Sequence, residues 1–184
     1  MKTTKAELDY EIELEEIGLI EGCLRNDGAI QKKLYDKYSD AMYTLVYRIL
    51  NNYEEAKDVL QEAFIQVFSN LYQFRMESSL GAWIKIIVIR AAYKHLNERK
   101  TFEILENNTP HHDESIQGTL DGEILERLIL SLPDGNRTIF LLVEVEGYKH
   151  NEVAKMLNIS KGTSKSQLNY AKKLLKEKLK NELI

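Results

Sequence analysis

Apolar residues recur every three or four positions along most of the chain, which is the period of an amphipathic α-helix. Near the end of the chain this period is interrupted at Asn158-Ile159-Ser160. Asn accepts the left-handed backbone of a tight turn more readily than most residues, and Ser160 can cap the helix that follows. The apolar face before the break contains Val153, Ala154 and Leu157, and the face after it contains Leu168, Ala171, Leu175 and Leu179. The pattern predicts two helices joined by a tight turn.

The second of these helices has a cationic face opposite its apolar face. Its polar members are spaced four, four, three and four positions apart: Lys161, Lys165, Asn169, Lys172 and Lys176. A helix of this kind, presented by a tight turn, suits the major groove of DNA. A lysine stripe alone would equally indicate a solvated face. The turn, the cap and the small Ala154 at the helix crossing favour DNA binding.

The same periodicity divides the chain into two helical domains. With only two prolines and nine glycines in 184 residues, the pattern predicts an all-α fold. We expect an acidic leader at residues 1–16, a first domain at 17–100, a polar linker at 101–121 and a second domain at 122–184. The first domain is interrupted near Asn51-Asn52 and at residues 77–79. The second domain is expected to begin with helices at about residues 121–130 and 134–146.

Charge is distributed unevenly between these parts. The formal net charge of −4 argues, taken alone, against a nucleic-acid binder. Residues 85–100, however, carry five Lys or Arg against one Glu, and residues 161–184 carry seven Lys against two Glu. Residues 101–126 contain seven acids and no Lys or Arg. Two separate basic blocks fit a protein that holds nucleic acid at two places.

The remaining bulk features describe a cytoplasmic protein. Cys23 is the only cysteine, so an internal disulfide is excluded, in agreement with a reducing cytosol. The first residues lead into an acidic segment, so we expect no signal peptide. The longest apolar-rich run, residues 83–92, is interrupted by Lys85 and Arg90 and is too short to span a bilayer. We therefore expect no membrane insertion.

The first domain carries two candidate binding surfaces. The first is an acidic helix row that can dock on a basic partner, although a solvated face explains it equally; its members are Glu54, Glu55, Asp58 and Glu62. The second combines the aromatic, hydroxyl-bearing segment 71–83 with the basic helix after it. Aromatic residues beside a cationic surface can stack on unpaired bases. Trp83 shares a helix face with Arg90, Lys94 and Asn97, and a plain core role for Trp83 remains the alternative.

A series of motifs then follows in one order. They are Asp58-Val59-Leu60-Gln61-Glu62-Ala63-Phe64, Trp83-Ile84, Leu132-Pro133-Asp134-Gly135-Asn136-Arg137, Glu146-Gly147-Tyr148, Glu152-Val153-Ala154 and Gly162-Thr163-Ser164-Lys165-Ser166. In this order and spacing they resemble an extracytoplasmic-function (ECF) sigma factor of bacterial RNA polymerase. The resemblance covers about residues 20–180. The helix-turn-helix motif also occurs in other regulators. The resemblance to an ECF sigma factor therefore rests on all the motifs together, in this order and spacing.

The resemblance implies a sigma region 2 helical bundle and a sigma region 4 helix-turn-helix, joined by a flexible acidic linker. Region 2 would dock on the clamp helices of the polymerase β′ subunit and capture the unwound non-template strand of the −10 element. Region 4 would bind the β flap and read the −35 element as duplex. The partners implied are therefore core RNA polymerase and promoter DNA. An anti-sigma factor is common in the family, and nothing in the sequence identifies one.

The resemblance also assigns candidate residues to each role. The core-polymerase candidates are Asp58, Gln61, Glu62, Phe64 and Phe68. The −10 candidates are Phe74, Arg75, Ser78, Ser79, Trp83, Lys85, Arg90, Lys94 and Asn97, with residues 74–79 matching the loop that pockets a flipped base. The −35 candidates are Arg137, Lys161, Thr163, Ser164, Lys165, Ser166, Gln167, Tyr170 and Lys172. Arg137 matches a phosphate-contacting position.

Several positions depart from the family pattern. Ser164 stands where the family usually has Val, on the core face of its helix, so its hydroxyl must find a partner or cost roughly 1–3 kcal/mol. Gln167 and Tyr170 stand where members often have Arg. Many members have Arg, Asn, Asp and Arg where this chain has Ile86, Arg90, Lys94 and Asn97. The promoter sequence is therefore left open, and we expect weaker DNA affinity without the core enzyme.

Three other classes of protein are alternatives to a sigma factor. An enzyme or metalloprotein would rest on His111-His112-Asp113-Glu114, which lies in the polar linker, and no phosphate loop or catalytic motif accompanies it. We therefore expect no catalysis, metal or cofactor. A free-standing helix-turn-helix regulator gives residues 20–100 no role. A sigma-like adaptor or antagonist without promoter reading would bind a partner but start no transcription.

Overall fold

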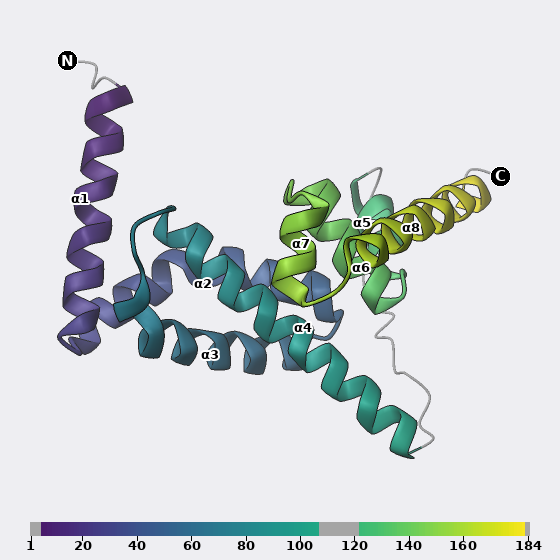
Figure 1. Cartoon of the computed structure of the whole chain (residues 1–184), viewed down its shortest axis with the longest axis horizontal. Coiled ribbons are helices and arrows are strands. Elements are labelled where there is room, and N and C mark those ends of the chain that lie inside the picture. Colours follow the sequence, from purple (N-terminus) through teal and green to yellow (C-terminus); the bar gives the residue numbers. More distant parts are fainter. Residues whose placement is uncertain (1–4, 107–121, 183–184) are drawn as a thin grey trace.

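The computed structural model describes residues 5–106 and 122–182, and the side chains of residues 14–101 and 122–182. Every regular element in this part of the chain is a helix (Figure 1). The first domain contains α1 (Lys5–Leu24), α2 (Gly28–Leu50), α3 (Tyr53–Asn70), the 3-10 helix η1 (Leu71–Gln73) and α4 (Leu80–Glu106). The second contains α5 (Gly122–Leu130), α6 (Asp134–Phe140), the π-helical turn η2 (Leu141–Val145), α7 (His150–Leu157) and α8 (Lys161–Glu182). The predicted all-α, two-domain fold is confirmed.

Helices α2, α3 and α4 pack on one another around the core of the first domain, while α1 crosses their end and projects away from them (Figure 1). The centre of this bundle is completely buried: Leu34, Val46, Ile49, Ala63, Val67, Ile84 and Val88. Burying a large apolar side chain contributes about 1.5–3 kcal/mol. The apolar side of each helix therefore fixes which polar side faces outward.

The predicted interruption at Asn51-Asn52 separates α2 from α3. Asn51 adopts the left-handed conformation, with φ of 52°, and its N–H donates to the carbonyl of Tyr47. Asn52 then caps α3, because its side-chain oxygen accepts from the N–H groups of Glu54 and Glu55 at 3.0 and 3.1 Å. One Asn thus ends a helix and the next begins one.

The helix-turn-helix forms as the sequence predicts. Helix α7 ends at Asn158, whose φ of 55° is left-handed and whose N–H donates to the carbonyl of Ala154. Ser160 Oγ accepts from the N–H of Thr163 at 2.9 Å and so caps α8. Val153 and Leu157 of α7 pack against the buried side of α8, which contains Leu168, Ala171 and Leu175.

The structure differs from the predicted boundaries at three places. Helix α1 begins at Lys5, inside the segment expected as a leader, and α4 continues to Glu106, inside the segment expected as a linker. Neither stretch contains Pro, and both are rich in strong helix formers, so a change in charge does not end a helix. The helix expected at 134–146 changes to π winding at Leu141, and the adjacent Leu141 and Leu142 are both buried there.

The left-handed turn at Asn158 generates a stability prediction. Replacing Asn158 by Val forces a β-branched side chain into this conformation and should lower the free energy of unfolding by at least about 1–2 kcal/mol. Asn158→Gly removes the side chain without adding strain. It should change the free energy of unfolding by only a few tenths of the loss expected for Asn158→Val. Urea denaturation followed by far-ultraviolet circular dichroism measures both. Equal losses in the two variants would contradict a conformational cause.

Candidate functional site

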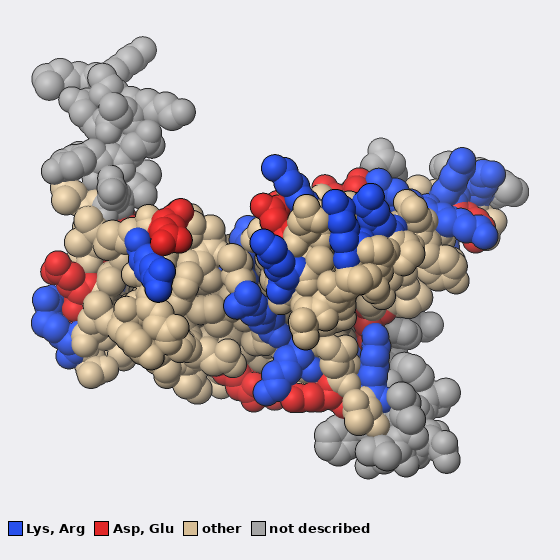
Figure 2. All heavy atoms as spheres, in the orientation of Figure 1, with Lys and Arg blue, Asp and Glu red and all other residues tan. Residues whose placement is uncertain are grey.

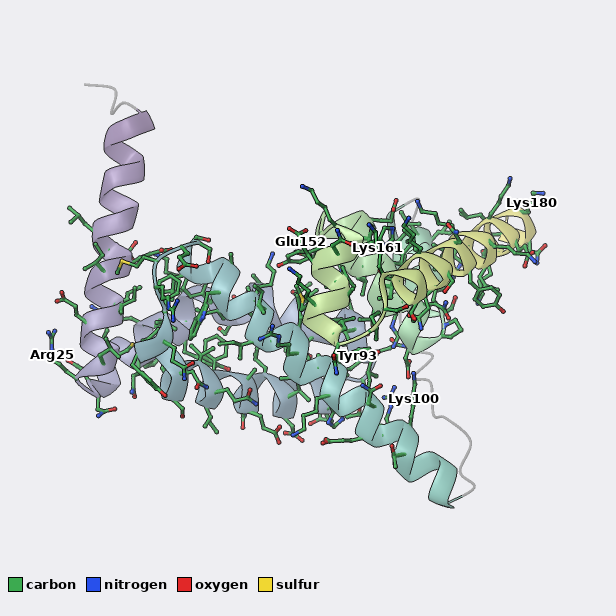
Figure 3. All side chains as sticks on the ribbon, viewed as in Figure 1. Arg25, Tyr93, Lys100, Glu152, Lys161 and Lys180 are labelled. Carbon is green, nitrogen blue, oxygen red and sulfur yellow. The ribbon has the colours of Figure 1, made fainter. Side chains whose placement is uncertain are left out.

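The polar face of α8 is open along the part that follows the turn. Lys161, Lys165 and Ser166 are exposed, and Tyr170 has 51% of its surface exposed. Thr163 and Gln167 are half-buried. Lys172 is held by Glu144 of η2, with Nζ 2.9 Å from the carboxylate. Figure 3 places Lys161 at the start of α8 near α7 and Lys180 at its far end.

Lysine and arginine side chains gather where the two domains meet. Figure 2 shows them over α7, the adjoining end of α8 and the middle of α4. The two basic blocks of the sequence thus lie on one face of the molecule. An electrostatic surface of this kind attracts the phosphate backbone of nucleic acid.

Ser164 does not belong to the exposed face. It is fully buried, and its hydroxyl lies 2.8 Å from Nδ1 of His150, the first residue of α7. The sequence therefore placed Ser164 correctly on the core side, and its hydroxyl has the partner that burial demands. Ser164 offers no exposed surface to DNA in this arrangement, and its place among the −35 candidates stays a prediction. Its role is to join the two helices of the helix-turn-helix.

Arg137 is also fully buried. Its guanidinium donates to the carbonyls of Arg48 and Ile49 at the end of α2, and to Asp134 Oδ1 at 2.8 Å. It further donates to Leu130 and Leu132 in its own domain, at 3.1 and 2.7 Å. A DNA phosphate has no access to it in this structure. The expected phosphate contact is therefore incompatible with this arrangement, because the fold uses the cation at the junction of the domains.

The segment expected to pocket a base is a short loop between η1 and α4. The ring of Phe74 packs 5.4 Å from that of Trp83, tilted by 49°, so both rings are half-buried. Arg75, Ser78 and Ser79 are exposed. Ser79 Oγ accepts from the N–H of Ala82 at 3.3 Å.

Met76 also lies in this loop and was not among the predicted site residues. It has a left-handed backbone with φ of 55° and is 55% exposed. A non-glycine residue held in this conformation is uncommon, and such outliers concentrate at binding sites. Met76 therefore adds an exposed apolar side chain to the hydroxyl groups of the loop.

Helix α1 supports the start of α4. Glu16 Oε2 accepts from the N–H of Leu80 at 3.3 Å, and its other oxygen accepts from the hydroxyl of Tyr38 at 2.8 Å. Burial, together with this hydrogen bond and the nearby negative charge, raises the pKa of Tyr38 above its ordinary value. Glu16 therefore supplies a cap to α4 from far away in the sequence.

The basic face of α4 faces the helix-turn-helix. Arg90, Lys94 and Asn97 are exposed, and they line a cleft of about 570 Å³ whose other wall is formed by residues 156–159 at the end of α7 and its turn. Tyr93 of α4 lies at this junction (Figure 3). Lys85, closer to the loop, pairs with Glu146 of the second domain at 2.6 Å.

The exposed side of α3 contains only part of the expected polymerase-binding set. Asp58, Gln61 and Glu62 are exposed. Phe64, in contrast, is 2% exposed and packs edge-on against Tyr35 at 4.7 Å, so it belongs to the core of the domain in this structure. Phe68 is half-buried, with its ring 6.2 Å from that of Phe64. Because both rings complete the core, Phe64→Asp would unfold the domain rather than block one surface.

Ile65 of α3 was not among the predicted polymerase-binding residues. It is 65% exposed, more than most other large apolar side chains of the described residues. It follows Gln61 by four positions and Asp58 by seven, so helical spacing puts it on the same face. This spacing was enough to place Ile65 on the exposed face from the sequence alone. Ile65 therefore adds an exposed apolar side chain to a face that otherwise carries two carboxylates and an amide.

A network of charges joins α3, α4 and α6. Glu55 of α3 lies 3.2 Å from Nε2 of His95 and 3.0 Å from Arg99 Nη1. Arg99 Nη2 in turn lies 2.9 Å from Asp134 of the second domain. The hydrogen bond between His95 and Glu55 raises the pKa of the imidazole and lowers the pKa of the carboxyl. Burial opposes ionisation of Asp134, but Arg137 and Arg99 hold its pKa below the ordinary value.

Two negative findings concern the described residues alone. No cluster of three or more His, Cys, Asp or Glu suited to a metal ion occurs among them. None of their helices is both long enough and apolar enough to cross a membrane. The run His111-His112-Asp113-Glu114 lies outside the described residues.

Two family models match the chain in the order of its domains. The model described as "Sigma-70 region 2" matches residues 34–101, and "Sigma-70, region 4" matches residues 122–175. The chain is 27% identical over 164 residues to the ECF RNA polymerase sigma factor SigW of Bacillus subtilis, which covers 80% of this chain and 88% of that protein. It is 29% identical over 177 residues to the RNA polymerase sigma-H factor of Pseudomonas aeruginosa, covering 88% and 92%.

Two solved structures share the fold. One is the sigma factor RpoE in complex with the anti-sigma factor NepR from Bartonella quintana, with a TM-score of 0.63 and 21% identity over 81% of this chain and 96% of that one. The other is CnrH in complex with the cytosolic domain of CnrY, with a TM-score of 0.55 and 15% identity over 91% and 98%.

The pair formed by His95 and Glu55 generates a pH prediction. Because folding raises the pKa of His95, its contribution is complete below about 6.5 and is lost as the pH rises through the higher folded value. Raising the pH from about 6 to 8 should therefore lower the free energy of unfolding, by less than about 1 kcal/mol since the pair is partly exposed. His95→Gln should remove this slope. Denaturant unfolding at several pH values measures it, and an unchanged slope in the variant would assign it to other groups.

Proposed function

This chain belongs to the extracytoplasmic-function group of the sigma-70 family and is an RNA polymerase sigma factor, and we propose that its two domains divide promoter recognition between α8 and the loop and face of α4. Sigma factors are initiation factors without catalytic activity that bind core RNA polymerase and promoter DNA. The observation that carries the proposal is the open cationic side of α8, which lies opposite a fully packed apolar side in the domain that matches region 4.

The exposed side of α3 would dock on core polymerase. Asp58 and Glu62 supply negative charge, and Gln61 supplies an amide beside them. Ile65 adds an exposed apolar side chain one helical turn beyond Gln61 on the same face. A partner surface with cations around an apolar pocket complements this set, as in most interfaces with a buried centre and a polar rim. The clamp helices of the β′ subunit are the proposed partner.

The loop before α4 would hold the unwound −10 strand. Phe74 and Trp83 offer aromatic surface, and Ser78 and Ser79 offer hydroxyl groups at the start of α4. Stacking of one base on an aromatic side chain is worth about 1–3 kcal/mol. Arg90 and Lys94 continue from the loop along α4 and would follow the phosphate backbone. Contacts that exist only with unpaired bases offset part of the free energy of strand separation.

Helix α8 would read the −35 element as duplex. Lys161, Lys165 and Ser166 face outward near its start, where a recognition helix contacts base edges and phosphates. Gln167 and Tyr170 are neutral side chains at positions where members of the family often have Arg. Fewer charge contacts mean lower affinity for duplex DNA by the chain alone, so the core enzyme would have to supply the second attachment.

A protein antagonist is a further proposed partner. The relative RpoE of Bartonella quintana was solved with the anti-sigma factor NepR. In this chain a cleft between α4 and the end of α7 offers apolar groups on one side and cations on the other. An antagonist with an acidic, amphipathic segment would fit this cleft.

Run-off transcription with purified core RNA polymerase on a genomic fragment library tests the function. With this protein added, new discrete start sites that share two upstream elements are expected. Binding to core without new transcripts would favour an adaptor or antagonist. Absence of core binding would favour a free-standing DNA regulator.

Replacing Lys165 by Ala should weaken transcription that depends on the −35 element by roughly tenfold, since contacts to base edges are worth about 1–3 kcal/mol. Binding to core polymerase should not change. Lys180→Ala is the matched control, because it removes the same charge from the same helix about 22 Å further along. Run-off assays on one promoter, with and without its −35 element, give the comparison. Loss of core binding in Lys165→Ala would contradict the assignment.

Replacing Ile65 by Asp should leave the fold intact and reduce affinity for a β′ clamp-helix fragment by at least about tenfold, because it replaces the exposed apolar side chain of the docking face by a charge. Leu125→Asp makes the same change at a position of the second domain that is 45% exposed. Its affinity for the fragment should equal that of the unaltered chain. Equal effects of the two variants in a fluorescence-anisotropy titration would point to misfolding or to a different docking surface.

A further inference from the structure

We infer that Glu16 of α1 is a positioning residue for the capture of unpaired bases, because it attaches the start of α4 to α1 and so fixes the shape of the loop before α4. That loop, the −10 loop, comprises residues 74–79 between η1 and α4. Its role in receiving bases belongs to the proposed function, on which this inference rests. The attachment of the loop to α1 can be measured without nucleic acid.

One half-buried carboxylate makes the attachment. Glu16 Oε2 accepts from the backbone N–H of Leu80 at 3.3 Å, and Glu16 Oε1 accepts from the hydroxyl of Tyr38 at 2.8 Å. These residues belong to α1, α4 and α2, so a single side chain joins three helices. Burial raises the pKa of Tyr38 above its ordinary value, so its hydroxyl remains a hydrogen-bond donor at neutral pH.

The N–H that Glu16 binds needs a partner from outside its own helix. Leu80 is the first residue of α4, and the first N–H groups of a helix have no carbonyl partner within it. Leu80 is also fully buried, and a buried donor without a partner is strongly unfavourable. A carboxylate suits this place because the start of a helix carries partial positive charge. Without Glu16, the first turn of α4 would have to move until water or another group could accept from Leu80.

Ser79 caps the same turn from the side of the loop. Its Oγ accepts from the N–H of Ala82 at 3.3 Å, and its carbonyl accepts from the N–H of Trp83 at 3.1 Å. Ser79 is also one of the candidates for contact with the −10 strand. Because Glu16 holds the residue that follows Ser79, the position of this hydroxyl depends on α1 as well as on α4.

Gly81 allows the ring of Tyr38 to lie directly on the first turn of α4. A Cβ atom at position 81 would lie 2.9 Å from Cε1 of Tyr38, which is closer than side chains approach one another. The ring therefore packs on the backbone beside the N–H that Glu16 binds. The hydrogen bond to Glu16 and the contact with Gly81 together set the distance between α2 and the start of α4.

The other end of the −10 loop also lies against α1. The 3-10 helix η1 contacts α1, and Leu71 of η1 is 2% exposed. The N–H of Phe74, the first residue of the loop, donates to the carbonyl of Leu71 at 3.0 Å. Figure 1 shows the segment between α3 and α4 beside α1. Both ends of a short loop are thus attached to one helix, which restricts the conformations that the loop can adopt.

The groups proposed to hold the −10 strand lie at or between these two attachments. The ring of Trp83, in the first turn of α4, lies 5.4 Å from the ring of Phe74. Met76 lies between them in the chain and has a left-handed backbone, a conformation that persists only where the surrounding structure imposes it. A shift at the start of α4 would therefore move Trp83 and Ser79 relative to Phe74.

Glu16 lies before the part of the chain that matches the region 2 model. That match covers residues 34–101, whereas α1 comprises Lys5–Leu24. The attachment of the −10 loop to α1 is therefore not implied by the match. It follows from the contacts of this chain alone.

The attachment can be measured in the free full-length chain. Trp83 is the only tryptophan, so its fluorescence reports on the start of α4 without a label. Glu16→Ala should increase the quenching of Trp83 by acrylamide, since the first turn of α4 loses its contact with α1. Glu15→Ala is the matched control, because it removes the same charge from a neighbouring exposed residue that pairs with Lys37 of α2 at 2.8 Å. Equal quenching in the two variants would overturn the inference.

The decisive experiment measures how tightly the full-length chain, bound to core RNA polymerase, holds single-stranded DNA. One oligonucleotide carries the non-template −10 element found by run-off transcription. A second has an abasic site in place of the base whose removal weakens binding of the unaltered complex most. Glu16→Ala should weaken binding of the first oligonucleotide by roughly fivefold or more, the lower end of what stacking of one base is worth. Binding of the second should change much less, and binding to core should not change.

The abasic comparison separates positioning from a general loss of stability. A destabilised domain would bind both oligonucleotides more weakly by the same factor, and that result would overturn the inference. If the unaltered complex itself does not distinguish the two oligonucleotides, the proposed role of the −10 loop fails. If the unaltered complex distinguishes them and Glu16→Ala distinguishes them equally well, the role of Glu16 fails alone.

A conservative variant tests the hydrogen bond itself. Glu16→Gln keeps an oxygen that can accept from Leu80 and should restore most of the discrimination lost in Glu16→Ala. Gly81→Ala leaves Glu16 in place but forces the ring of Tyr38 away from α4, so it should reduce the discrimination as well. A Glu16→Gln complex as weak as Glu16→Ala would overturn the hydrogen-bonded attachment.

Discussion

One buried cation determines how the two domains meet. Arg137 is completely enclosed, and its acceptors come from the end of α2, from the turn between α5 and α6 and from Asp134. An unpaired charge in such a place is far more costly than any single apolar contact is favourable. The segments that supply its acceptors are therefore held together, and direct contacts between α4 and α7 complete the junction.

The same local device prepares both sides of the molecule. Asn51 ends α2 in the left-handed conformation, which leaves the last carbonyls of α2 available to Arg137. Asn158 ends α7 in the same conformation, which turns the chain sharply enough to present the polar face of α8. A residue that tolerates positive φ thus has two uses in this chain. At the end of α2 it leaves carbonyls free for Arg137, and at the end of α7 it exposes the polar face of α8.

The sequence predicted those features that depend on residues close together in the chain. The turn at Asn158, the cap at Ser160 and the burial of Ser164 follow from helical phase and local hydrogen bonding. The sequence did not predict features that depend on contacts between parts of the chain that are far apart in sequence. A motif position could not reveal that Phe64 completes a core, because an apolar residue beside acids suits a core as well as an interface.

The position of Arg137 could not be predicted for a related reason. Its partners in the first domain are backbone carbonyls almost ninety residues earlier, and a carbonyl leaves no trace in residue identity. Glu16 is similar, since it caps α4 from α1 through a backbone N–H. Long-range contacts between a charged side chain and a helix end depend on topology alone, whereas the exposure of Ile65 was already contained in its spacing from Asp58 and Gln61.

The strength of the closed junction follows from the difference between its centre and its rim. The rim pairs are partly exposed, and pairs of that kind contribute about 0–1 kcal/mol each and weaken with salt. The centre exchanges carbonyl acceptors for water when the domains separate, so its net contribution is only that of a few hydrogen bonds to a charged group, about 1.5–3 kcal/mol each. The fully buried centre therefore contributes more to the junction than any single pair at the partly exposed rim.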